Sequence, residues 1–127
     1  MPYLQFDTSA AMTGGEKRSF AAEVTERYAA VMGTTTDHVA VSVWERADAD
    51  LHLGREDPGP VLFLDAHVRR GRSAERRREF ALAVMDAARA HWKIPKRNMK
   101  VVFTEHDGDQ MMGYDRVGDE RTADEED

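Results

Sequence analysis

The hydrophobic and polar positions of the chain follow one pattern twice. Each copy begins with a short apolar stretch, continues with apolar residues at helical spacing, and ends with a second apolar or alternating stretch. The three segments cover residues 3–8, 14–32 and 38–44 in the first copy, and residues 61–67, 74–92 and 99–104 in the second. The pattern predicts two strand–helix–strand units, joined by a connector over residues 46–60.

The two copies align without a gap when the chain is shifted by 60 residues. The shift pairs Phe20 with Phe80, which are apolar positions of the two predicted helices. It also pairs Thr13 with Ser73, and both residues stand where a helix N-cap is expected. Agreement between caps and apolar positions supports an internal duplication more strongly than sequence identities alone.

Residues at the predicted helix ends have the chemistry that those ends require. Thr13 opens a Thr-Gly-Gly-Glu capping box that ends at Glu16. Gly33 is placed to end the first helix, and Pro95 is expected to stop the second.

A helix that crosses between parallel strands in each half predicts an α+β fold of the β-α-β type. The two βαβ units would form one four-stranded mixed sheet with both helices on one face. The other face would be bare. Leu4 and Phe6, or Val41 and Val43, would lie on one face or the other, so we expect that apolar residues on the bare face drive oligomerisation.

The composition excludes several classes of protein. A chain of 127 residues with 41% hydrophobic residues fills one core, and the absence of cysteine excludes disulfides, thiolate metal sites and a cysteine nucleophile. No apolar run approaches the roughly 20 residues that span a bilayer, and no secretory signal opens the chain. We therefore expect a cytoplasmic protein with no membrane partner.

Most of the net charge lies at the carboxyl end. Residues 118–127 contain six acids and one base, a charge of −5 out of a total of −6. This predicts one domain over residues 1–117, with repeats of about 1–58 and 59–117, followed by a flexible acidic tail. The six arginines within residues 69–78 do not predict a nucleic-acid partner, because the body has no net positive charge and no aromatic residues interleave them.

Pro2 is the first candidate catalytic residue. A small second residue generally permits removal of Met1, which would leave a secondary amine that titrates near neutrality. Many proteins begin with Met-Pro for no catalytic reason. If Met1 were retained, the Pro2 nitrogen would be an amide without basic character.

Two arginines are candidates for binding a carboxylate. Arg69 and Arg72 lie on either side of Gly71, between a strand and the helix that Ser73 caps. Guanidinium groups pair bidentately with carboxylates, and the free N–H groups of a helix N-terminus add positive potential. The following arginines, residues 76–78, are interpreted as surface residues with Glu75 and Glu79 as partners.

The other polar candidates are less specific. Tyr114 follows the last predicted strand, and its phenol could donate to an oxyanion or orient water. His106 lies near Asp107 and Asp109, but no second histidine stands at ligand spacing, so no metal is predicted. The remaining histidines are interpreted as surface or core residues: His38, His52, His67 and His91.

Taken together, Met-Pro2, the duplicated βαβ unit, the Arg69-Arg-Gly-Arg72-Ser motif and the Gln110-Met-x-x-Tyr114 segment resemble the tautomerase superfamily. Within it, they resemble the cis-3-chloroacrylic acid dehalogenase group, from Pro2 to about Arg116. The resemblance implies a homotrimer without a cofactor. It also implies a catalytic amino-terminal proline, two arginines that hold the substrate carboxylate, and a tyrosine that assists at the reacting carbon. These roles correspond to Pro2, Arg69, Arg72 and Tyr114.

Two departures from the dehalogenase pattern change the predicted reaction. Tyr28 stands where the dehalogenases have a histidine that helps to bind the carboxylate, so it would supply a hydrogen bond without charge. Their water-activating glutamate has no aligned equivalent among the acids of the tail, such as Asp119, Glu120 or Glu125. The chain is therefore predicted to be a tautomerase of 2-oxo (enol/keto) carboxylic acids, with weak promiscuous hydratase or dehalogenase activity.

Three alternatives remain open at this point. The first is a cis-3-haloacrylic acid dehalogenase or hydratase. The second is a lyase of the malonate semialdehyde decarboxylase type, with Asp37 as the acidic partner of the proline. The third is a non-catalytic oligomer, which would be marked by a retained Met1.

Overall fold

The computed structural model describes residues 1–117, and the predicted acidic tail lies outside them. Two helices and four long strands alternate in the predicted order and are followed by a short hairpin. The elements are β1 (Tyr3–Thr8), α1 (Gly14–Met32), β2 (Ala40–Glu45), β3 (Leu62–Arg69), α2 (Ala74–Trp92), β4 (Met99–His106), β5 (Met112–Gly113) and β6 (Arg116–Val117).

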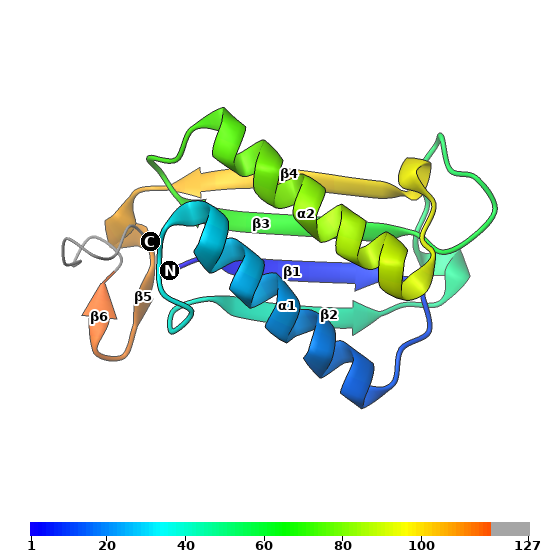
Figure 1. The fold of residues 1–127 in the computed structure, drawn as a ribbon, viewed down its shortest axis with the longest axis horizontal. Coiled ribbons are helices and arrows are strands. Elements are labelled where there is room, and N and C mark those ends of the chain that lie inside the picture. Colours follow the sequence, from blue (N-terminus) through cyan, green and yellow to red (C-terminus); the bar gives the residue numbers. More distant parts are fainter. Residues whose placement is uncertain (118–127) are drawn as a thin grey trace.

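One mixed sheet with the strand order β2-β1-β3-β4 forms the framework of the fold. β1 and β2 are parallel, β3 and β4 are parallel, and the two central strands, β1 and β3, are antiparallel. Both helices cover the same face of the sheet (Figure 1). This arrangement confirms the predicted α+β fold with two βαβ units and both helices on one face.

The helix ends confirm most of the predicted caps. The Thr13 hydroxyl accepts from the Glu16 N–H, the Glu16 carboxylate accepts from the Thr13 N–H, and Gly33 ends α1 in the left-handed conformation at φ 70°. The second helix ends at Trp92, as the periodicity predicts, but Lys93 rather than Pro95 forms its cap. Lys93 takes the left-handed conformation at φ 54° directly after Trp92, so α2 has already ended when the chain reaches Pro95.

The core lies between the helices and the sheet. Phe20 of α1 packs edge-on against Phe6 of β1, with ring centroids 5.0 Å apart, and against Trp92 of α2 at 4.6 Å. Tyr28 and Phe80 form a second edge-to-face pair between the helices, at 5.1 Å. Such pairs add about 0.5–1.5 kcal/mol each beyond the burial of their area. The aromatic residues therefore fix both helices against each other and against the sheet.

Two strands end later than their apolar patterns predicted, and β2 starts later. β3 and β4 run on through Arg69 and His106, because these residues still pair in the parallel ladder. Glu105 and His106 therefore belong to the last strand rather than to the loop that follows it. β2 begins at Ala40, after a turn that contains His38.

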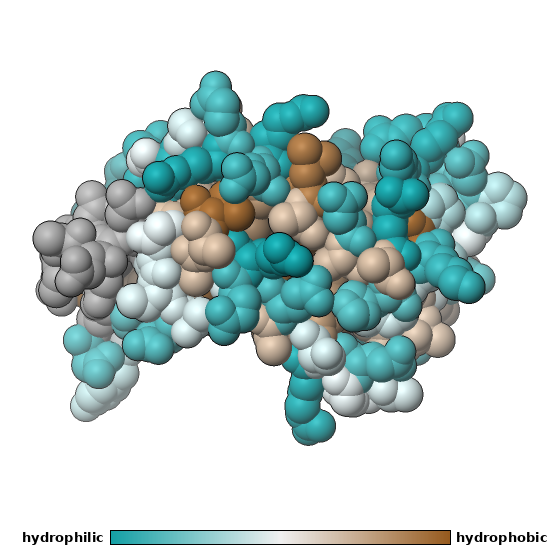
Figure 2. Space-filling model, viewed as in Figure 1, coloured by the Kyte–Doolittle hydropathy of each residue, from teal (hydrophilic) through white to brown (hydrophobic). Residues whose placement is uncertain are grey.

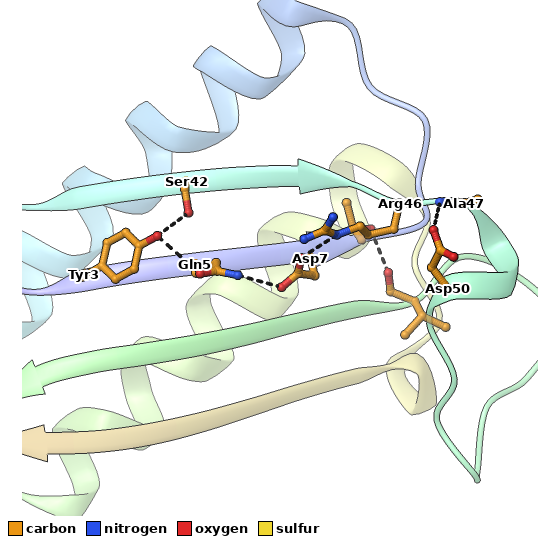
Figure 3. A network of polar contacts seen from close by, with 9 residues as sticks. Tyr3, Gln5, Asp7, Ser42, Arg46, Ala47 and Asp50 are labelled. Carbon is orange, nitrogen blue, oxygen red and sulfur yellow. Dashed lines mark hydrogen bonds and ion pairs between the residues drawn. The ribbon is translucent and has the colours of Figure 1, made fainter.

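The open face of the sheet carries more polar residues than expected. Leu4 and Phe6 lie on the helix face, and Val41 and Val43 pack against the same core. The opposite face carries a row of hydrogen bonds. Tyr3 bonds to Gln5 and Ser42, Gln5 bonds to Asp7, and Asp7 pairs with Arg46 (Figure 3). None of the four apolar residues named for oligomerisation thus lies on the open face.

The helix-bearing face is predominantly hydrophilic, with small apolar areas between polar side chains (Figure 2). Neither helix of the described residues is long and apolar enough to cross a membrane.

Candidate functional site

The topology brings six chain segments to one end of the sheet. β1 begins there, and β3 and β4 end there because they run antiparallel to β1. α1 ends and α2 begins at this same end, and the β5–β6 hairpin folds beside the amino terminus (Figure 1). The residues predicted from sequence to carry chemistry come from these segments.

A hollow of about 530 Å³ lies beside the amino terminus. Pro2 is buried in its wall, and the Pro2 carbonyl accepts a hydrogen bond of 3.1 Å from the Ala40 N–H. Met1 also lines the hollow, and its Cε would lie only 3.3 Å from a Cβ at position 113. Removal of Met1 would therefore enlarge the hollow and place the Pro2 amine on its wall. The lining residues are Met1, Pro2, Tyr3, Asp37, His38, Ala40, His67, His106, Gln110, Met111, Met112 and Gly113.

Two histidines in this wall bind each other. The Nδ1 atom of His67 lies 2.8 Å from the Nε2 atom of His106, and Nε2 of His67 lies 3.2 Å from Oδ1 of Asp65. The rings of Tyr3 and His67 also stack, with centroids 6.3 Å apart. Sequence reasoning missed this pair and treated His67 as a surface or core residue. The signal lies in the strand register, which pairs His106 with Arg69, two residues beyond His67 on the same face.

Arg72 is the more deeply buried of the two predicted carboxylate-binding arginines, at 8% exposure. Its Nη2 donates to the Met32 carbonyl at the end of α1 over 3.4 Å. Its Nε has no hydrogen-bond partner, and no carboxylate within residues 1–117 pairs with this guanidinium. A buried cation of this kind favours an anionic ligand, because an unpaired buried donor costs about 1–3 kcal/mol.

The neighbouring arginines have protein partners. Arg77 donates to Glu105 over 3.1 Å and to the Arg72 carbonyl over 2.8 Å, whereas its predicted partners were Glu75 and Glu79. Arg69 is half-buried at the end of β3, on the same side of the strand as His67. Arg69 and Arg72 thus stand at the end of the sheet where the hollow lies, although neither lines it.

The two predicted tyrosines lie elsewhere. Tyr28 is fully buried in the core beneath α1, and Tyr114 is fully exposed at the turn of the β5–β6 hairpin. Neither lines the hollow of this chain, and their predicted roles at the substrate stay predictions. The acids considered for activating water, Asp119, Glu120 and Glu125, lie outside the described residues.

No protein-family model matches the sequence, and a search of curated proteins finds no match. Solved structures do match. A member of the cis-3-chloroacrylic acid dehalogenase family has a TM-score of 0.81 and 20% identity, with 93% of this chain and 84% of that chain covered. A fused 4-OT, described as a symmetric trimer, has a TM-score of 0.79 and 17% identity, with coverage of 91% and 94%.

A third structure, of a protein inactivated by 2-oxo-3-pentynoate, has a TM-score of 0.78 and 15% identity, with coverage of 91% and 94%. These likenesses cover 91% to 93% of this chain. The chain therefore has the same β-α-β fold as these solved structures.

Proposed function

We propose that this protein is a tautomerase of 2-oxo carboxylic acids, with the amino group of Pro2 as its catalytic base. One observation carries the proposal: Pro2 lines a hollow at the end of the sheet where Arg72 is buried. The Arg72 guanidinium has no carboxylate partner within residues 1–117. The hollow supplies a place for the substrate, and the arginine supplies a charge that its acid group would neutralise.

The chemistry follows from the ordinary properties of these groups. Once Met1 is removed, the Pro2 nitrogen is a secondary amine that is partly neutral at physiological pH. The neutral amine can take a proton from the carbon beside a carbonyl and return it in the reverse reaction. Arg69 and Arg72 would hold the carboxylate of the substrate and stabilise the negative charge that develops on the enolate. Proton transfer of this kind needs only the amine and the substrate-binding cations.

Hydration or hydrolytic dehalogenation needs a further group. Water must be activated by a carboxylate, and Glu105, at the end of β4, is already paired with Arg77 at 3.1 Å. We therefore propose that hydratase and dehalogenase activities are weak. Faster turnover of a haloacrylate than of a 2-oxo acid would contradict this proposal.

One observation favours a second candidate reaction. Asp37 lines the hollow together with Pro2, as a decarboxylase of the malonate semialdehyde type would need for an acidic partner. The products and the pH dependence of the rate distinguish the two reactions. A tautomerase returns an isomer at a rate that rises as the Pro2 amine becomes neutral, whereas decarboxylation releases carbon dioxide.

We also propose that the working protein is a homotrimer, the assembly named for the structurally similar fused 4-OT. Tyr114 is fully exposed beside its own hollow, so a neighbouring subunit is the surface that it could contact. Light scattering after size-exclusion chromatography measures the assembly directly. A monomer at micromolar concentration would contradict this part of the proposal.

The activity is tested with purified protein whose intact mass shows that Met1 has been removed. The protein should ketonise phenylenolpyruvate, and Pro2→Ala should lose most of the activity because alanine supplies a primary amine without the ring. Pro58→Ala is the matched control, since Pro58 is exposed in the connector far from the site. Equal rates for wild type and Pro2→Ala would refute the proposed role of Pro2.

A further inference from the structure

A row of side chains on the open face connects the hollow to the middle of the sheet. His106 forms a hydrogen bond with His67, and Nε2 of His67 lies 3.2 Å from the Asp65 carboxylate. The two imidazole rings stack with centroids 5.1 Å apart. Both histidines line the same hollow as Pro2, and the proton transfer described above uses neither of them.

The geometry limits how many protons the two rings carry. A hydrogen bond between imidazole nitrogens needs one donor and one acceptor, and a doubly protonated ring has only donors. If both rings were doubly protonated, two N–H groups would face each other across 2.8 Å. The pair therefore holds at most one positive charge, and Asp65 stabilises that charge from the side of His67.

The same contacts show which nitrogen could reach a substrate. Both nitrogens of His67 are engaged, Nε2 with Asp65 and Nδ1 with His106. The Nε2 of His106 is engaged with His67, so its Nδ1 is the nitrogen of the pair that has no partner among the described residues.

We propose that His106 is a second catalytic residue of the hollow, which donates a proton to the substrate oxygen while Pro2 works at the carbon. His67 and Asp65 are its positioning residues. His67 also carries the proton that passes to His106 when His106 has given up its own. This inference rests on the proposed tautomerase function and adds to it an acid that protonates the enolate oxygen.

The protons balance in the direction from keto acid to enol. Before the reaction, Pro2 is neutral, His67 is protonated on both nitrogens, and His106 carries its proton on Nδ1. The carbon–hydrogen bond breaks and its proton binds to the Pro2 nitrogen, while the enolate oxygen takes the Nδ1 proton of His106. The Nε2 of His106 takes the Nδ1 proton of His67, which leaves two neutral rings that still share a hydrogen bond. Return of the proton from Pro2 to the pair through water restores the starting state.

This scheme requires opposite protonation states at the two groups. The rate should rise with pH as Pro2 becomes neutral and should fall as the histidine pair loses its charge, which gives a bell-shaped profile.

Several other titratable and charged groups lie near the histidine pair. They are Pro2 and Tyr3 from the amino terminus and β1, Asp37 and His38 from the turn before β2, Asp65 and Arg69 from β3, and Arg70 and Asp107 from the loops after β3 and β4.

Two substitutions remove the proton and keep the hydrogen bond. In His106→Gln, the side-chain amide takes the place of Nε2, and in His67→Asn it takes the place of Nδ1. His52→Gln is the matched control, because the His52 side chain is 83% exposed in the connector. The assay measures kcat, KM and their pH profiles for enolisation of phenylpyruvate. Loss of a general acid should lower kcat of both variants by about 10²- to 10⁴-fold, with KM nearly unchanged and the falling limb lost.

The outcomes separate this inference from the proposed function. A large loss in Pro2→Ala together with wild-type kcat and an intact falling limb in His106→Gln overturns the role of His106 and leaves the tautomerase in place. Equal activity of wild type and Pro2→Ala overturns both. A loss confined to KM assigns the pair to substrate binding and also overturns its role as the acid.

Discussion

Replacement of Arg72 by methionine separates the stability of the fold from the binding of a carboxylate. Methionine keeps the apolar stem of the side chain and removes the charged group. The substitution deletes the bond of Nη2 to the Met32 carbonyl, but this carbonyl also accepts from Nη1 of Arg76 over 3.3 Å. It also removes a buried Nε donor that has no partner in the described chain.

The two effects are of similar size and opposite sign. A hydrogen bond to a charged group contributes about 1.5–3 kcal/mol, and an unsatisfied buried donor costs about 1–3 kcal/mol. The free energy of unfolding of Arg72→Met should therefore stay within about 1 kcal/mol of the wild type. Binding should change much more, because the methionine cannot pair with an acid.

Ligand-induced stabilisation makes this difference measurable. At a hundred times its Kd, phenylpyruvate stabilises the native state by about 2.7 kcal/mol, which raises Tm by about 10 °C at roughly 4 °C per kcal/mol. If Arg72→Met weakens binding a hundredfold, the same concentration stabilises by about 0.4 kcal/mol, or about 2 °C. Differential scanning calorimetry with and without phenylpyruvate measures both quantities.

Arg78→Met is the matched control. Arg78 is exposed on α2, so the substitution removes an arginine without touching a buried charge. The control should keep the full ligand-induced rise in Tm. The reasoning would be refuted if Arg72→Met lost several kcal/mol without ligand and still showed a rise of about 10 °C with it. Arg72 would then be a structural residue, and the carboxylate would bind elsewhere.

Two further predictions concern the fold. Phe20→Ala removes the ring that packs against Phe6 and Trp92, so urea unfolding should show a loss of about 3–5 kcal/mol; a loss below 1 kcal/mol would contradict the packing. The backbone N–H of Thr13 donates to Glu16 over 2.8 Å and holds the pKa of Glu16 below its usual value of 4.5. The charged cap thus stabilises the fold above that value, and its contribution is lost as pH falls through the lowered pKa. Between about pH 5 and pH 3, wild type should lose more stability than Glu16→Gln in urea titrations, and parallel curves would count against the cap.

The repeat and the helix caps could be predicted because they depend on neighbours along the chain. Thr13 and Ser73 mark the helix starts by chemistry that acts within one turn, and both helices begin and end where the periodicity placed them. The ends of β3 and β4 could not be predicted as well. Arg69 and His106 are polar, and only the pairing with a neighbouring strand keeps them in the ladder.

The site was predictable at Pro2 and less so elsewhere. Pro2 directly precedes the first strand, so the sequence alone places it at one end of the sheet. The bond between His67 and His106 depends on the parallel register of two strands, and no spacing along the chain reveals it. The burial of Arg72, in contrast to the exposure of Arg76, depends on how the start of α2 packs against the end of α1.

The most direct test of the account is covalent labelling of the mature amino terminus. Incubation with 2-oxo-3-pentynoate, followed by peptide mass spectrometry, tests the removal of Met1, the nucleophilicity of the Pro2 nitrogen and the binding of a 2-oxo acid together. The account predicts one adduct per chain on Pro2, loss of activity in step with labelling, and protection by phenylpyruvate. A peptide that still begins with Met1, or an adduct on another residue while Pro2 stays unmodified, would contradict it.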